Sequence, residues 1–142
     1  MIIPGLVSAT FKAESPDFVL AALKKADLHA VEWSENWHIP AGDTALARDL
    51  RERTLAQGAE IAAYGSYYRL GQNSDPAKDF LPTLQSAAAL GAPLIRIWGG
   101  GTYSMSTATK NATVCWNLCW TTPRSSFWKM PLNGSGFYRK RR

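Results

Sequence analysis

Four clusters of carboxylate, hydroxyl, aromatic and basic side chains follow four short apolar runs near the start of the chain. The clusters are Ser8-Ala9-Thr10, Glu32-Trp33-Ser34-Glu35, Tyr64-Gly65-Ser66-Tyr67-Tyr68-Arg69 and Arg96-Ile97-Trp98-Gly99-Gly100. Carboxylates can exchange protons with a substrate, aromatic rings can stack on it, and guanidinium groups can bind its anionic parts. This composition is typical of the rim of a small-molecule pocket.

Glu32 and His38 are the candidates for acid and base chemistry. Glu32 ends an apolar run, where a carboxylate can accept a proton, orient a hydroxyl or support a metal from outside its ligand shell. His38 follows in the same loop, where a neutral imidazole can bind a metal or a sugar hydroxyl, or can simply be solvated. His29 precedes its apolar run, so we expect it on the opposite side, away from the chemistry.

Aromatic side chains and one cation are the candidates for substrate binding. Core packing is the alternative for each aromatic residue of this set: Trp33, Tyr64, Tyr67 and Trp98. Arg96 lies between apolar neighbours, and a partly buried cation there needs a carboxylate or the phosphate of a ligand. An ion pair between Arg96 and Glu32 is the structural alternative that we favour.

The apolar runs and the segments between them predict an alternation of strands and helices, and hence a parallel α/β sheet. The runs cover residues 2–8, 30–33, 61–64 and 94–98, spaced by about thirty residues, the size of one βα unit. A helix is predicted over residues 16–26, a second from Asp43 to Gly58 and a third from Asp75 to Gly91. Pro82 should kink the third helix, or move its start to near Leu81.

Composition favours a protein of the cytoplasm. The 142 residues suffice for one domain, and no apolar stretch approaches the roughly 18 residues of a membrane span. The N-terminus lacks a basic leader segment. The two cysteines, Cys115 and Cys119, have no matching ligands nearby, so we expect free thiols in a reducing compartment.

The segment after Gly101 differs from the rest of the chain. The net charge is +5, yet all 11 acidic residues lie at or before Asp79, and seven of the 16 basic residues follow Gly101. The segment has no sustained period of strand or helix, and it ends in Arg139-Lys140-Arg141-Arg142. We expect an α/β domain over residues 1–101 and an unrelated or frame-shifted basic tail over residues 102–142.

Five stretches are similar to the N-terminal half of the sugar phosphate isomerase/epimerase family. This family belongs to the xylose isomerase-like TIM barrel superfamily, which also contains the endonuclease IV type of DNA repair enzyme. The stretches are Gly5-Leu6-Val7-Ser8, Ala30-Val31-Glu32-Trp33, His38-Ile39-Pro40, Tyr64-Gly65-Ser66-Tyr67-Tyr68 and Leu90-Gly91-Ala92-Pro93-Leu94-Ile95-Arg96-Ile97-Trp98. The last stretch is the most specific, and the resemblance covers about residues 2–101.

The resemblance implies a partial (β/α)8 TIM barrel of about four βα units that moves protons on a sugar or sugar phosphate. It also implies a divalent metal, Mn, Mg or Zn, whose ligands come largely from later strands and are mostly missing here. A homodimer paired through the half-barrel edges is one expectation, and an inactive truncated chain is another. The alternative function is a nucleic-acid-associated binding protein related to endonuclease IV, although nucleic acid is the less expected partner.

Overall fold

The computed structural model describes residues 2–70, 72 and 75–99, so the predicted basic tail lies outside the described residues. The elements follow one another in the order β1 (Gly5–Val7), the 3-10 turn η1 (Ser8–Phe11), α1 (Pro16–Lys25), β2 (Ala30–Ser34), α2 (Thr44–Ala56), β3 (Glu60–Arg69), α3 (Pro76–Leu90) and β4 (Ile95–Trp98). The predicted α/β alternation is confirmed.

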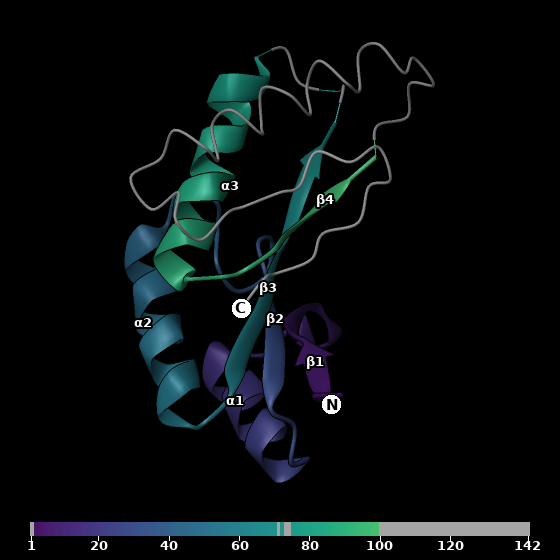
Figure 1. Ribbon diagram of the computed structural model, residues 1–142, viewed down its shortest axis with the longest axis vertical. Coiled ribbons are helices and arrows are strands. Elements are labelled where there is room, and N and C mark those ends of the chain that lie inside the picture. Colours follow the sequence, from purple (N-terminus) through teal and green to yellow (C-terminus); the bar gives the residue numbers. More distant parts are fainter. Residues whose placement is uncertain (1, 71, 73–74, 100–142) are drawn as a thin grey trace.

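The four strands form one parallel sheet in the order β1-β2-β3-β4, so each strand lies beside its neighbour in sequence. Val31 aligns with Leu6 on one side and Ile61 on the other, and Trp33 aligns with Tyr64. Each connection between parallel strands crosses over through a helix, and Figure 1 shows α2 and α3 side by side along one face of the sheet.

Side-chain caps explain where the helices begin. The carboxylate of Asp43 accepts the Leu46 N–H at 3.0 Å before α2, and that of Asp75 accepts the Lys78 N–H at 3.2 Å before α3. α3 begins at Pro76 and continues through Pro82, so the alternative start near Leu81 is wrong. A left-handed Gly91, with φ of 74°, ends it.

β3 is longer than the sequence predicts, and β1 is shorter. The predicted run of residues 61–64 lies in the first half of a ten-residue strand, so Tyr67 and Arg69 belong to the strand itself. Two contacts extend it: Arg69 aligns with Trp98 of β4, and the Tyr68 ring packs on Phe80 of α3 with centroids 4.9 Å apart. The pairing with β4 is irregular between Gly65 and Arg69.

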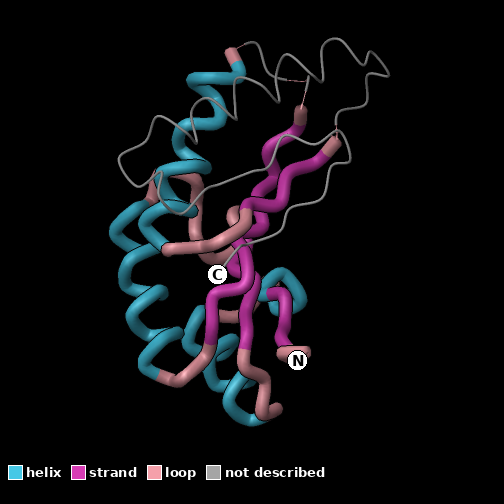
Figure 2. Tube along the Cα trace, viewed as in Figure 1, coloured by secondary structure: helices cyan, strands magenta, loops and turns pink. Residues whose placement is uncertain are grey.

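The main hydrophobic core lies between the sheet and the helices, whose arrangement Figure 2 shows as a tube. A second, smaller cluster is formed by Tyr68, Phe80 and Leu84. All three helices contribute to the main core, with Leu20 of α1, Leu50 of α2 and Leu90 of α3 buried against the sheet. Trp33 and Tyr64 are its largest fully buried side chains. The indole of Trp33 donates to the Thr54 hydroxyl at 3.1 Å, which satisfies its only polar atom.

No helix in the described part of the chain has the length and apolar character to cross a lipid bilayer.

Two leucines of α2 allow a matched test of this core. We expect Leu50→Ala to lower the free energy of unfolding by about 2–5 kcal/mol, because Leu50 is fully buried and its loss leaves a cavity. Leu55→Ala makes the same change on the same helix where the side chain is 50% exposed, and should cost less than about 1 kcal/mol. Urea unfolding followed by circular dichroism measures both. Equal losses would contradict the placement of the core.

Candidate functional site

The candidate site lies at the carboxyl ends of the strands, on and beside the sheet face that the helices leave open. Side chains alternate between the two faces of a strand. Trp33, Tyr64 and Ile95 therefore face the helices, whereas Glu32, Gly65 and Arg96 share the other face.

Glu32 and Arg96 form an ion pair across this open face. The Arg96 Nε–H donates to Glu32 Oε1 at 2.9 Å, with the Arg96 side chain 34% exposed and the Glu32 side chain 18% exposed. The two residues lie on β2 and β4, on either side of β3. The ion pair expected from the sequence is thus present, and it places a carboxylate and a guanidinium side by side at the strand ends.

Gly65 makes room for this pair. A Cβ atom at Gly65 would lie closer than van der Waals contact to both Glu32 Oε1 and the Arg96 guanidinium, the latter at 2.8 Å. Any larger residue would have to push one of the two charged ends aside. The glycine is therefore needed for space between β2 and β4, the two strands that flank β3, since its backbone is in ordinary extended conformation.

Glu35 is a buried carboxylate that the sequence places in a cluster without marking it as a site residue. Its Oε1 accepts the Thr83 hydroxyl at 2.9 Å, and its Oε2 accepts the Tyr67 N–H at 2.5 Å. Its own N–H donates to the Gly65 carbonyl at 3.0 Å. Glu35 thereby ties the loop after β2 to β3 and to α3.

His38 is buried on the helix side of the same loop. Its ring packs edge-on against Trp33 with centroids 5.8 Å apart, and neither ring nitrogen has a hydrogen-bond partner among the described residues. Burial lowers the pKa of His38 below its ordinary value of 6.5, and the nearby carbonyls of Glu14 and Phe11 oppose this effect. The imidazole does not reach the open face in this arrangement.

Three aromatic rings line the strand ends at the surface. The Trp37 indole donates to the Tyr67 hydroxyl at 3.3 Å, and the Tyr67 and Trp98 ring centroids are 6.2 Å apart. Trp37 and Trp98 are each more than two fifths exposed. We call Trp37, Tyr67 and Trp98 the aromatic row. Trp37 was not among the sequence candidates, although its position next to His38 in the loop after β2 was a signal for it.

Cations flank the aromatic row at both ends. Lys12, which follows η1, lies over the Trp37 ring at 5.2 Å, and Arg96 lies over the Trp98 ring at 5.1 Å. Arg69 also lies over Trp98, at 5.9 Å. A row of rings between cations can bind a ligand that combines a flat or ring-shaped part with negative charge.

The structure divides the sequence candidates into two groups. Four of them, Glu32, Tyr67, Arg96 and Trp98, come together at the open strand ends. The other three, Trp33, His38 and Tyr64, are buried on the helix side. The Tyr64 hydroxyl donates to the Ile39 carbonyl at 2.8 Å, and burial, reinforced by the charge of Glu35, raises the pKa of Tyr64 above its ordinary value.

The described residues do not assemble a metal site. No three His, Cys, Asp or Glu side chains gather within residues 2–70, 72 and 75–99. The two carboxylates at the strand ends already accept hydrogen bonds. Glu32 accepts one from Arg96, and Glu35 accepts two, from the Thr83 hydroxyl and the Tyr67 N–H. The part of the chain in view therefore does not fit the divalent metal by itself.

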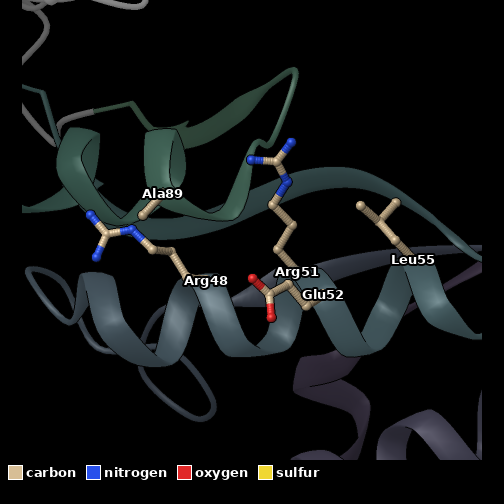
Figure 3. Close-up of a pocket in the computed structure, with 5 residues that line it drawn as sticks. All are labelled: Arg48, Arg51, Glu52, Leu55 and Ala89. Atoms are coloured by element: carbon tan, nitrogen blue, oxygen red, sulfur yellow. The ribbon is translucent and has the colours of Figure 1, made fainter.

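A depression of about 320 Å³ lies elsewhere, between α2 and α3. Figure 3 shows two arginines and a glutamate of α2 around it, with Ala89 of α3 opposite. The Arg51 guanidinium also lies close to Gly91, at the end of α3, where a cation is favoured by the helix dipole. This depression differs from the strand ends in two ways. Arg51 and Glu52 carry opposite charges, and no aromatic side chain is among the described residues that line it.

The sequence matches no protein-family model, and the search of curated proteins found no match to it.

Gly65→Ala tests whether the glycine holds the ion pair in place. The added methyl group should displace the Glu32 and Arg96 side chains toward solvent, because their flexible ends are what it meets. Since the pair is partly exposed, the free energy of unfolding should fall by only about 1 kcal/mol or less. The Arg96 Nε–H signal in a ¹⁵N NMR spectrum should move to the position of a solvated guanidinium.

Gly99→Ala is the matched control, because nothing lies within 4 Å of a Cβ atom there. An unchanged Arg96 signal in Gly65→Ala, or the same change in both variants, would contradict the role of Gly65.

Proposed function

We propose that this chain carries the N-terminal half of a TIM barrel of the sugar phosphate isomerase/epimerase type. Two features of the sheet support this. A doubly wound sheet has helices on both faces and a strand order that reverses at a switch point. Here the order is β1-β2-β3-β4 throughout, and all three helices share one core on one face. Closing such a sheet into a barrel requires strands at both free edges, from further chain or from a second copy.

The single observation that carries the function is the Glu32–Arg96 pair beside the aromatic row. In the proposed reaction, the Glu32 carboxylate accepts a proton from a carbon or hydroxyl of the sugar. Arg96, whose guanidinium lies against both Glu32 and Trp98, binds the developing negative charge or the phosphate of the substrate. The exposed ring of Trp98 offers a flat surface for the C–H face of the sugar. All three groups lie at the strand ends, where barrel enzymes place their chemistry.

The divalent metal stays an expectation drawn from the resemblance. Bound, it would polarise the oxygens between which the proton moves. The residues in view do not gather its ligands, and the roles of Glu32, Arg96 and Trp98 given above do not depend on it.

Glu32→Gln tests the proposed site against a control on the same sheet. Calorimetric titration with five- and six-carbon sugar phosphates, with Mn²⁺ and again with EDTA, should reveal one ligand class that binds the unaltered chain. Glu32→Gln should weaken that binding by about tenfold, a loss of about 1.4 kcal/mol, because the carboxylate is removed and Arg96 is left without its partner.

Glu60→Gln should leave the affinity unchanged, since Glu60 begins β3 at the opposite end of the sheet. If no sugar phosphate binds under either condition, or if both variants behave alike, the proposed function is wrong for this chain.

Binding of single-stranded nucleic acid is the second candidate. The aromatic row favours it, because successive bases stack on rings while flanking cations contact phosphates. The cations at issue are Lys12, Arg69 and Arg96. Such binding weakens steeply as salt is raised, because several phosphates are neutralised at once, whereas a sugar phosphate offers only one or two.

Fluorescence anisotropy with a short labelled oligothymidylate distinguishes this candidate. If the aromatic row binds it, Trp98→Ala should weaken the affinity by about tenfold, within the range of about 1–3 kcal/mol per stacked base. Leu55→Ala, which removes an exposed apolar side chain from α2, should have no effect. An affinity that is independent of salt, or a Trp98→Ala variant that binds normally, would count against nucleic acid.

A further inference from the structure

Three buried polar atoms lack a hydrogen-bond partner within the described residues, and all three lie at the end of β2. They are the Ser34 hydroxyl oxygen and both ring nitrogens of His38. Only 3% of His38 is exposed. Buried polar groups are nearly always paired, because an unpaired one loses its bonds to water without replacement. A cluster of such atoms in one short loop therefore needs an explanation beyond packing.

The His38 imidazole lies where two surface segments meet. One is the loop after β2, in which the His38 N–H donates to the Ser34 carbonyl at 3.1 Å. The other is the segment after η1, whose Phe11 and Glu14 carbonyls face the imidazole. Lys12 of this second segment lies over the Trp37 ring of the first. The His38 imidazole and the contact between Lys12 and Trp37 therefore connect the same two segments.

The loop that holds His38 also holds one end of the aromatic row in place. Glu35 binds the Tyr67 N–H and the Thr83 hydroxyl, and Trp37 donates to the Tyr67 hydroxyl. His38 comes directly after Trp37 in the sequence. A displacement of His38 would therefore carry Trp37 with it and break its contacts to Tyr67 and Lys12.

Within the part of the chain that the structure describes, no carboxylate forms an ion pair with this imidazole. The titratable groups on the elements packed around it are Lys12 and Glu14 on the segment after η1, Glu35 on its own loop and Tyr64 on β3. Within the described residues none of these side chains forms an ion pair or hydrogen bond with His38. A charged imidazole in this place would be desolvated and without a carboxylate partner, and the facing carbonyls of Phe11 and Glu14 offset the desolvation only in part. This condition favours its exit to water.

We propose that His38 is a pH-sensitive latch for the aromatic row. The neutral imidazole keeps the loop of residues 35–39 closed against the segment after η1. Protonation drives the imidazole out to solvent, which moves Trp37 away from Tyr67 and Lys12. The latch depends on the contacts of the loop and not on the identity of any ligand, so it stands apart from the proposed function.

The direction of the pH effect follows from burial. The pKa of His38 is lowered in the closed form, so the open form binds the proton more readily. The closed loop is fully stable above about pH 6.5, the ordinary value, and loses stability as the pH falls from there toward the lowered pKa. Within that window the ratio of open to closed loop grows tenfold per pH unit.

NMR of the full chain without any ligand tests the latch. The indole N–H of Trp37, assigned through Trp37→Phe, should change as the pH is lowered from 7.5 to 5, with the same midpoint as the His38 ring protons. The Trp98 indole, which donates to the Ser66 carbonyl at 3.1 Å, is the internal reference and should stay unchanged.

His38→Asn should abolish the pH response of Trp37, whereas His29→Asn should retain it, because His29 is largely exposed and precedes β2. Should His38→Asn fail to fold, the two midpoints in the unaltered chain still decide. A His38 ring that titrates while Trp37 does not move would overturn the latch. So would a Trp37 signal and a His38 ring that both stay unchanged down to pH 5.

Discussion

The strict alternation of side chains along parallel strands is the constraint on which the rest of this structure depends. Because Trp33 and Tyr64 must face the helices, their neighbours Glu32 and Gly65 must face the other way. A slip of one residue would bury the charged face and expose the core. The hydrophobic effect on the helix side therefore fixes the register, and the register brings Glu32 to Arg96 without any attraction between them being needed to fold the sheet.

Polar contacts hold the loop after β2 in place, whereas apolar contacts hold the sheet. Ser86 of α3 donates to the Pro40 carbonyl at 3.1 Å and accepts the Gly42 N–H at 2.9 Å. Glu35 adds bonds to β3 and to α3. A loop that leaves the strand end must satisfy its own backbone groups, and here buried side chains do so in place of water. His38 is the exception in this loop, since its buried ring nitrogens have no hydrogen-bond partner among the residues that the structure describes.

Much of the fold could be predicted from the sequence, because its signals are local. Ser15, Asp43 and Asp75 mark helix starts by their own hydrogen bonds, and the apolar runs mark the strands. The candidate site was harder, because the face on which a residue lies depends on register. Tyr64 and Tyr67 stand three residues apart in one aromatic run, so alternation along β3 places one in the core and the other at the surface. The apolar run of residues 61–64 does not indicate that the strand, and with it the alternation, continues to Arg69.

The Glu32–Arg96 pair links the proposed barrel to the proposed function. In a closed barrel this face becomes the interior, where both charges lose water and their mutual attraction only partly offsets that loss. Within the described residues the guanidinium donates one hydrogen bond, from Nε, although it carries five N–H groups. The remaining donors would need acceptors in the interior. An anionic or hydroxyl-rich ligand supplies such acceptors, so a barrel built on this pair is more stable with its substrate than without it. In this proposal the barrel tolerates the two buried charges because the bound ligand offsets the free-energy cost of burying them.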